Sequence, residues 1–254
     1  AWYKDYPKSS FHFFDDRREW SQMDKAGHVW TAYQLSRISA ETWKWGGLSN
    51  RKAAWLGGAS AFAFQSVIEI LDGFSAEWGF SVGDMEANLI GSAGFVAQEL
   101  LFRDQIVQVK LGYKPYDYSP ELRTRRDQLF GTSLQEQILK DYNGQRYWLS
   151  GNVSKLAPGF GLPPWLNIAI GYGADGMLGG HDNTWTDKQG NFFDRRDIRR
   201  TRRFYIAPDI DLTKIKTNSK LLRSVFFLLN SVKIPAPTIE YNSSGRFKLH
   251  AIMF

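Results

Sequence analysis

Three successive apolar segments carry ionisable side chains at the spacing of a helix turn. The polar positions are Asp24, Lys25 and His28 in the first segment, Glu69 and Asp72 in the second, and Ser81, Asp84 and Asn88 in the third. Side chains three or four positions apart lie on one face of a helix. The spacing therefore predicts that three helices turn one histidine, several acids and an asparagine toward a common point.

A histidine among carboxylates can bind a divalent metal ion or transfer protons. If the protein is an enzyme, we expect His28 to be the general base and the acids to bind a metal or share a proton. These acids are Glu69, Asp72 and Asp84. No cofactor is predicted, although this set of side chains could hold a divalent metal ion.

The same residues could instead form a structural network, because an isolated ion in a protein core is very costly. Asp24 could cap the first helix and orient His28, and Lys25 could neutralise Asp72. Asp84 could lie in the first turn of the third helix, where the helix dipole favours an acid. A fold-specifying network and a chemical site would show the same pattern, so both interpretations stay open.

Glycines mark the ends of the expected helices. The periodicity predicts helices over residues 21–45, 50–71 and 81–102. Gly46-Gly47 would end the first helix and Gly73 the second. Ser81 followed by Asp84 resembles a capping box, which would begin the third helix.

The pattern changes to alternation after Arg103, and alternation is typical of strands. The expected strands cover residues 106–113, 146–153, 165–177, 202–212 and 237–254. A turn at 242–245 would divide the last of them into a hairpin, and residues 221–232 are expected to be helical.

The predicted fold class is α+β. An aromatic lead-in over residues 1–20 precedes a helical module over 21–102 and a β-rich region with interspersed helices over 103–254. The sheet is expected to be antiparallel, rich in aromatic residues and packed on the helical module. Closure into a barrel is the alternative, because the chain ends on Phe254 after an alternating strand. About five strands fall below the eight that the smallest membrane barrels have.

Composition narrows the class of protein. The chain has 254 residues, 43% of them apolar and 15% aromatic, with a formal net charge of +6. The aromatic content suits wide strands or a membrane interface, and the charge suits anionic lipid or nucleic acid. No nucleic-acid motif accompanies the charge, so no nucleic-acid partner is expected. The absence of cysteine excludes disulfides, thiol catalysis and cysteine-ligated metals.

No unbroken apolar run reaches the roughly 20 residues needed to cross a bilayer. The nearest run, residues 53–71, is interrupted by Ser60, Gln65, Ser66 and Glu69. It is expected to be either a buried core helix or a helix dipping into a membrane surface. The opening residues AWYKDYPKSS lack an apolar core, so we expect no signal peptide within them.

Three motifs occur in order: D-K-x-x-H at 24–28, E-x-x-D at 69–72 and W-G-F-S-x-x-D-x-x-x-N-x-x-G at 78–91. Through them, roughly residues 20–102 resemble the YfiM-type family of uncharacterised bacterial periplasmic proteins and, more distantly, VanZ-like membrane proteins. The resemblance implies a three-helix VanZ-like module in a Gram-negative cell-envelope protein, associated with the outer membrane. It implies no established activity. The helices of this chain are less continuously apolar than those of VanZ-like proteins.

Six arginines lie within nine residues near the middle of the β-rich region. They are Arg195, Arg196, Arg199, Arg200, Arg202 and Arg203. Guanidinium groups match phosphate geometry, so this segment could bind lipid headgroups or lipopolysaccharide. Alternatively it is a solvated loop that Asp194 and Asp197 partly neutralise. Asp209 and Asp211 would share a strand face, where a calcium site is conceivable although the EF-hand spacing is missing.

These observations lead to two functional expectations. The first is a non-catalytic scaffold or accessory subunit of an outer-membrane protein complex, held at the periplasmic face of or within the outer membrane. Its partners would be that complex, the membrane surface or lipopolysaccharide. The second is an envelope enzyme that acts on a lipid-linked or cell-wall substrate through the histidine and carboxylates.

Overall fold

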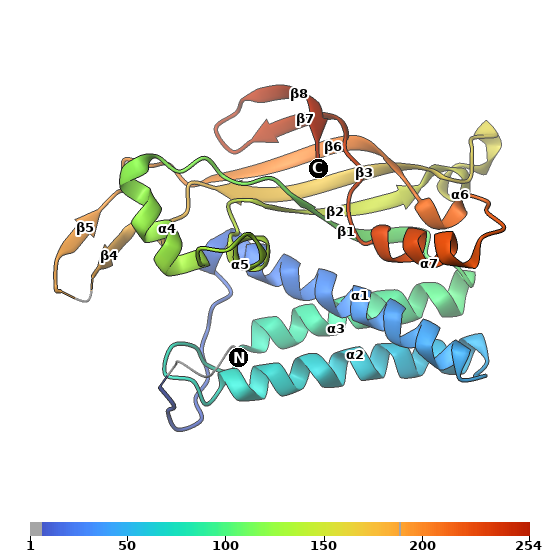
Figure 1. Ribbon diagram of the computed structural model, residues 1–254, viewed down its shortest axis with the longest axis horizontal. Helices are drawn as coiled ribbons and strands as arrows, with labels where there is room; N and C mark the ends of the chain where they lie inside the picture. Colours follow the sequence, from blue (N-terminus) through green and yellow to red (C-terminus); the bar gives the residue numbers. More distant parts are fainter. Residues whose placement is uncertain (1–6, 188) are drawn as a thin grey trace. The chain divides into compact units, whose positions relative to one another are not determined.

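The computed structural model describes residues 7–187 and 189–254, and the chain divides into two compact units (Figure 1). Unit 1 covers Ala1–Gln105 and unit 2 covers Ile106–Phe254. Unit 1 is helical, and unit 2 contains an antiparallel sheet with short helices. The fold is therefore α+β, as predicted, with a three-helix module at the N-terminal side.

Unit 1 consists of α1 (Met23–Trp45), α2 (Asn50–Asp72) and α3 (Val82–Phe102), which pack against one another (Figure 1). A short 3-10 helix, Glu19–Gln22, precedes α1. Gly46 and Gly73 follow the last residues of α1 and α2, as the helix-stop signals predicted. The Ser81 hydroxyl accepts a hydrogen bond from the backbone N–H of Asp84, so Ser81 caps α3.

Small residues let the three backbones approach closely. A Cβ atom added at Gly91 would lie 2.4 Å from the carbonyl oxygen of Val29, and one at Gly57 would lie 2.7 Å from that of Ser36. The buried apolar residues of this module are mostly alanines, with Met23, Tyr33, Phe95 and Val96 as the larger exceptions. Small residues at helix interfaces are common in membrane proteins, where close backbone packing replaces a hydrophobic driving force.

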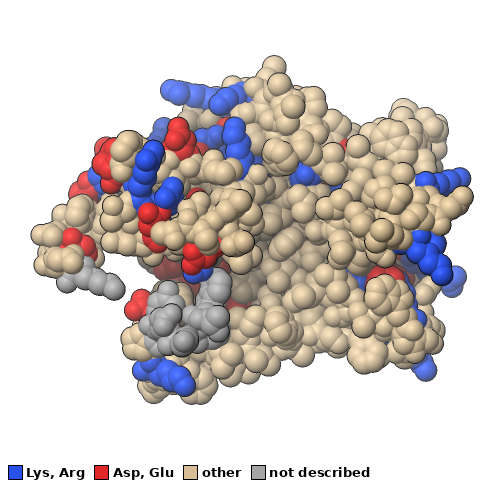
Figure 2. All heavy atoms as spheres, viewed as in Figure 1, with Lys and Arg blue, Asp and Glu red and all other residues tan. Residues whose placement is uncertain are grey.

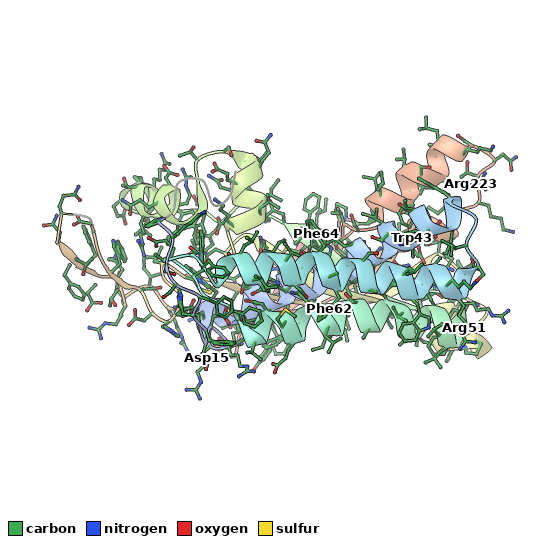
Figure 3. All side chains as sticks on the ribbon, turned by 90° about the horizontal axis from the view of Figure 1, so that it is seen from below. Asp15, Trp43, Arg51, Phe62, Phe64 and Arg223 are labelled. Carbon is green, nitrogen blue, oxygen red and sulfur yellow. The ribbon has the colours of Figure 1, made fainter. Side chains whose placement is uncertain are left out.

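Many large apolar side chains of unit 1 face outward. The exposed ones on α1–α3 are Ile38, Trp43, Trp45, Trp55, Leu56, Phe64, Val67, Ile70, Leu71, Val82, Leu89, Ile90, Leu101 and Phe102. Trp43 and Phe64 are labelled in Figure 3, and in Figure 2 much of the surface over these helices carries no charged residue. Helix α2 is long and apolar enough to cross a membrane by length and composition, and a third of its apolar window is buried.

Residues 7–20 form an irregular segment beside the ends of α2 and α3. Single bridges join Lys8 to Ser75 and Phe13 to Phe80. The Phe11 ring contacts Phe74, with ring centroids 5.3 Å apart. The aromatic residues of this lead-in therefore pack against the loop between α2 and α3. Residues 1–6 of the lead-in lie outside the described residues.

In unit 2, six of the described strands form one antiparallel sheet in the order β1-β2-β3-β6-β7-β8 (Figure 1). They are β1 (Val107–Tyr113), β2 (Gln145–Asn152), β3 (Leu166–Asp175), β6 (Thr201–Ile210), β7 (Ala236–Asn242) and β8 (Phe247–Met253). The five predicted strand segments account for all six, because the last forms the β7–β8 hairpin. The expectation that the sheet could close into a barrel is wrong: β1 and β8 remain its two edges.

The remaining elements of unit 2 are short and mostly lacked a sequence signal. They are β4 (Thr184–Thr186), β5 (Phe192–Asp194), α4 (Arg123–Phe130), α5 (Leu134–Lys140), α6 (Val153–Leu156), α7 (Lys220–Leu229) and the 3-10 turns Pro120–Leu122, Pro158–Phe160 and Leu212–Lys214. Of these, α7 was predicted. Its apolar repeat LLRSVFFLL was long enough to show helical spacing, whereas three-residue strands are too short to show alternation.

The outer edge of β1 is partly covered by the segment that leads into β7. Leu111 bridges to Val232 in parallel, with hydrogen bonds from the N–H of Leu111 to Ser231 and from the N–H of Lys233 to Leu111. Such pairing protects an edge strand from pairing with other chains. In the β7–β8 pair, the register shifts between Ala236 and Thr238, as it does at a β-bulge.

Candidate functional site

Lys25, on the first turn of α1, is the centre of the polar cluster predicted in unit 1. Its ammonium nitrogen lies 2.7 Å from a carboxylate oxygen of Asp16, 2.9 Å from Asp24 and 2.7 Å from Asp84. Asp16 in turn accepts a 2.6 Å hydrogen bond from the hydroxyl of the α3 cap, Ser81. One lysine thereby joins the lead-in, α1 and α3.

His28 lies one turn further along α1 and faces both other helices. Its Nδ1 atom is 3.1 Å from Asn88 Oδ1 on α3 and 3.7 Å from Glu69 Oε1 on α2. Asn88 Oδ1 also accepts a hydrogen bond from Gln65 Nε2. Because that oxygen can only accept, the contact assigns the proton of the neutral imidazole to Nδ1.

The other ring nitrogen of His28 points to two acids. Nε2 is 3.4 Å from Asp84 Oδ1 and 3.8 Å from Asp24 Oδ1. A neutral Nδ1–H imidazole has its lone pair on Nε2. Nε2 is thus the atom that could take a proton or coordinate a metal ion.

Glu69 is buried on α2, with 2% of its side chain exposed. Burial raises the pKa of Glu69 to about 8, and the neighbouring carboxylates Asp72 and Asp24 add to the rise. Asp72 therefore acts on the cluster through its charge. The predicted partner of Lys25 was Asp72, whereas the contacts of the Lys25 ammonium described above are with Asp16, Asp24 and Asp84.

Burial also raises the pKa of Asp84 to about 9, with Asp24 adding to the rise and Lys25 opposing it. Burial disfavours the Lys25 ammonium, but Asp24, Asp84 and Asp16 outweigh burial and its pKa lies above the ordinary value. The two shifts are compatible, because Lys25 keeps other carboxylate partners when one acid binds a proton. The cluster thus combines a charged lysine with at least one acid that retains its proton near neutral pH.

Three of these residues have the geometry of a cation site. One ligand atom each from Asp24, His28 and Asp84 lies within 4.8 Å of the others, which is close enough to hold a metal ion. Lys25 already contacts Asp24 and Asp84, and its ammonium neutralises the two acids that would ligate the ion. A divalent ion would therefore have to displace or repel this lysine.

Hydrogen bonds or ion pairs join seven of the eight residues of the predicted cluster, and Asp72 acts through its charge on Glu69. Two further residues, Asp16 and Gln65, take part. Asp16 lies in an irregular segment without periodicity, so no helical spacing could relate it to Lys25. Gln65 lies one turn before Glu69 on α2, and its i, i+4 relation to Glu69 was a usable signal. One role was assigned wrongly: Asp24 does not cap α1, which begins after Gln22.

The Nδ2 atom of Asn88 is buried without a hydrogen-bond partner among the described residues. Asn88 itself is fully buried. A buried unpaired amide costs stability, so a water molecule is expected to accept a hydrogen bond from Nδ2 at this point.

The six clustered arginines at positions 195–203 have different partners and do not form one cationic surface. Arg195 pairs with Asp197 at 3.0 Å, and Arg196 pairs with Asp194. Arg200 donates to the carbonyl oxygens of Gly179 and Gly180, and Arg203 pairs with Asp175 and Glu240. Arg202 donates to the Tyr172 hydroxyl, and Arg199 is exposed.

A second polar network fills one face of the sheet in unit 2. Lys110 and Lys233, both fully buried, contact Asp209 at 2.8 Å and 3.4 Å. Gln108 donates to Asp211 at 2.8 Å. Asp209 and Asp211 do share a strand side, but their partners are lysine and glutamine side chains of this chain.

Residues 12–99 match a family model with the description Predicted periplasmic lipoprotein (DUF2279). Comparison with curated proteins and with solved structures finds no match. The matched residues contain the whole polar cluster and most of α1–α3. The helical module is therefore similar to an uncharacterised family of periplasmic proteins, which supports a place in the cell envelope.

Proposed function

We propose that the protein is a non-catalytic scaffold or accessory subunit of an outer-membrane protein complex. The envelope location follows from the family that residues 12–99 match. The contact of the Lys25 ammonium with three carboxylates carries the non-catalytic assignment. A lysine in this position neutralises the acids from within the chain and ties α1 and α3 to the lead-in.

The outward apolar side chains of α1–α3 support an accessory role. Monomeric soluble proteins rarely expose large contiguous apolar surfaces, and such surfaces usually bind a protein or a membrane. Trp45 is 80% exposed and Leu101 is 73% exposed. These helices therefore offer surface for a partner while their polar side chains hold the module together.

The test is affinity purification of the tagged protein from detergent-solubilised envelope. We expect a defined set of outer-membrane proteins to co-purify in stoichiometric amounts. Recovery of the protein alone at full yield would contradict the proposal.

A pair of lysine variants on α1 sharpens this experiment. Lys25→Met leaves three carboxylates without their cation, and breaking a buried pair costs about 3–5 kcal/mol. Lys44→Met removes only a partly exposed pair with Glu41, which is worth about 0–1 kcal/mol. We expect Lys25→Met to lower the melting temperature and lose the partners, and Lys44→Met to keep both.

The alternative is an envelope enzyme or metal protein that acts on a lipid-linked or cell-wall substrate. The convergence of Asp24, His28 and Asp84 favours it, with His28 as the base and Glu69 and Asp72 as nearby acids. His28→Gln and Asp84→Asn separate the two proposals. Loss of the cellular phenotype at an unchanged melting temperature, together with bound metal in the purified protein, would favour the enzyme.

A further inference from the structure

On the sheet of unit 2, one face buries many polar side chains beside the apolar cluster that contains Trp148, and the opposite face exposes apolar side chains. On one face, Lys110, Ser150, Asn167, Asp209 and Glu240 are at most 2% exposed. Hydrogen bonds join the first four, such as Ser150 Oγ to Asp209 Oδ2 at 2.6 Å, and Glu240 pairs with Arg203 and His250. The charged residues of this face depend on buried partners, so rearranging the sheet to expose this face would be costly. The apolar face is therefore the one that stays exposed.

The exposed face is ordered in rows that run across the strands. One row is aromatic and pairs in register from β3 to β8: Tyr172, Phe204, Tyr241 and Phe247. The next row, on the same face, is aliphatic: Leu149, Ile170, Ile206, Ile239 and Leu249. The aliphatic side chains are 47–79% exposed.

Arginine side chains lie beside the aromatic row, at the end away from the aliphatic row. Arg202 lies two residues before Phe204 and donates to the Tyr172 hydroxyl on the same face. Exposed Arg246 immediately precedes Phe247 in the β7–β8 turn. Along the strands the face therefore passes from arginine to aromatic to aliphatic side chains.

This order matches the depth profile of a lipid leaflet. Phosphates of the headgroup layer attract arginine, the interfacial layer favours tyrosine, and the hydrocarbon accepts apolar side chains such as leucine, isoleucine and phenylalanine. A protein partner would require shape complementarity but no such gradient.

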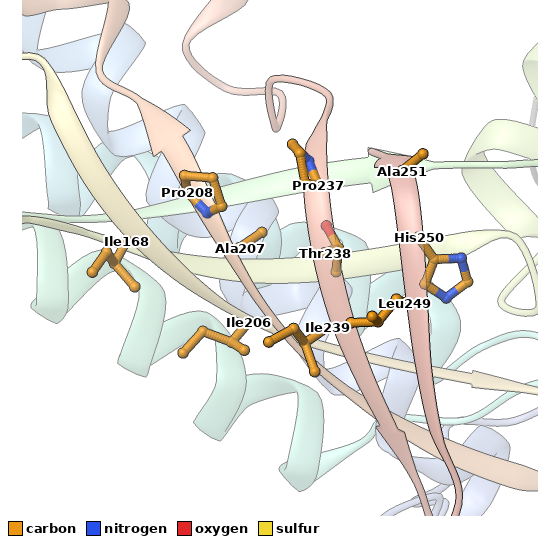
Figure 4. Close-up of a pocket in the computed structure, with 10 residues that line it drawn as sticks. All are labelled: Ile168, Ile206, Ala207, Pro208, Pro237, Thr238, Ile239, Leu249, His250 and Ala251. Carbon is orange, nitrogen blue, oxygen red and sulfur yellow. The ribbon is translucent and has the colours of Figure 1, made fainter.

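An open groove lies within the aliphatic part of the face (Figure 4). It has a volume of about 790 Å³ and is lined mainly by apolar residues of β6–β8, among them Ile206, Pro208, Pro237 and Leu249. Strand β6 continues to Ile210, but its pairing with β7 ends at Ile206 and Ile239. Proline has no N–H to donate, so Pro208 and Pro237 cannot extend the β6–β7 hydrogen-bond ladder, and the groove lies where that pairing stops.

We propose that this face of the sheet lies in the surface layer of a lipid bilayer, with the aromatic row among the headgroups and the aliphatic row in the hydrocarbon. The proposal deepens the membrane association stated above and rests on the envelope location, but it does not depend on a partner complex.

The test uses the full chain, which contains no cysteine, so a single introduced cysteine carries a fluorescent label without background. Labels at Phe204→Cys and Ile206→Cys report the two rows. A label at Leu139→Cys on α5, where the leucine is 63% exposed, is the control. The probe is a vesicle of phosphatidylethanolamine with a minor share of phosphatidylglycerol, carrying spin-labelled lipids that quench at a shallow or a deep position.

We expect vesicles to shift the emission of both sheet labels to the blue, with deep quenching strongest at 206 and shallow quenching strongest at 204. The control label should change little. Leu249→Asp should weaken vesicle binding about tenfold or more, because charge on a lipid-facing strand position is strongly unfavourable, whereas Leu139→Asp should not.

Equal quenching at positions 139, 204 and 206, or no quenching, would overturn the proposal. So would a blue shift that grows with protein concentration in the absence of lipid, which would assign the face to a second copy of the chain. Neither result would change the outcome of the affinity purification, so failure of the lipid proposal and failure of the accessory role can be told apart.

Discussion

Glu69 illustrates how burial sets the properties of one side chain. It lies among acids, and its carboxyl is 2% exposed. Its proton has two sources of stabilisation, since burial disfavours the charged form and so do Asp72 and Asp24. The neutral form is therefore part of the folded state near neutral pH.

This protonation makes the stability of the helical module depend on pH. The pKa of Glu69 rises from an ordinary value of 4.5 to about 8, so between these values the folded state holds a proton that the unfolded state has released. The free energy of unfolding must then fall as the pH rises through this window. The expected fall across this window is on the order of 5 kcal/mol, since one pKa unit corresponds to about 1.36 kcal/mol.

Chemical denaturation at several pH values, followed by circular dichroism, measures this dependence. Glu69→Gln should flatten the curve, although Asp84, whose pKa is raised to about 9, will leave a residual fall. Glu86→Gln is the control, because Glu86 is 59% exposed. A curve for Glu69→Gln as steep as that of the unchanged protein would show that Glu69 is ionised in the folded state.

At the residue scale, most of the polar cluster was predictable and some contacts were not. The three-residue and four-residue spacings identified His28, Glu69 and Asp84, because a helix turns such positions to one side. The same reasoning could not choose the partners of Lys25. Asp16 reaches Lys25 from an irregular segment, and only the folded chain shows that contact.

At the scale of helices, glycine positions set how closely α1, α2 and α3 approach. Gly91 and Gly94 lie three residues apart on α3, yet their surroundings differ. A Cβ at Gly91 would meet backbone atoms of Val29 and Tyr33, whereas a Cβ at Gly94 would meet nothing within 4 Å. Backbone atoms cannot move aside as a flexible side chain can.

The pair Gly91→Ala and Gly94→Ala tests this packing. Overpacking costs about 1–3 kcal/mol, so Gly91→Ala should lower the free energy of unfolding by at least about that amount. Gly94→Ala should raise it by about 0.5–1 kcal/mol, because alanine is the better helix former. Thermal melts of both variants measure these opposite changes in stability. Equal melting temperatures would exclude close contact between α1 and α3 at Gly91.

The elements themselves were largely predictable, because helices end at Gly46 and Gly73 and begin at Ser81 through local chemistry. The strands were visible in their alternation. Which face of each strand is buried was harder to predict. Residues 106–113 alternate between apolar and polar types, and the usual assumption buries the apolar set. In the structure Gln108 and Lys110 are buried instead, because their partners come from β6 and the segment before β7.

At the scale of the whole molecule, the two units have separate cores. In unit 2, Trp148, Ala169, Tyr205, Ala207 and Met253 form one buried apolar cluster. In unit 1, Tyr33 packs against Phe95 and donates to Gln105. Every contact named for the polar cluster lies within unit 1.

We therefore expect a fragment of residues 1–105 to fold in mild detergent without unit 2. Far-ultraviolet circular dichroism should show a cooperative helical transition, and Lys25→Met should lower its midpoint as in the full chain. A fragment of residues 1–86 is the control, since it lacks Asn88, Gly91 and Phe95 and should show no such transition. A fragment 1–105 without cooperative melting would mean that unit 2 is needed to form the helical module.

The two buried lysines of unit 2 also affect the order in which the strands of the sheet can fold. Lys110 reaches Asn230, 120 residues further along the chain, and shares Asp209 with Lys233. The Lys110 ammonium cannot be dehydrated favourably until these distant partners have arrived. Strand β1 must consequently wait, still hydrated, until the segment around Asn230 has been synthesised, and the interior of the sheet closes only after that.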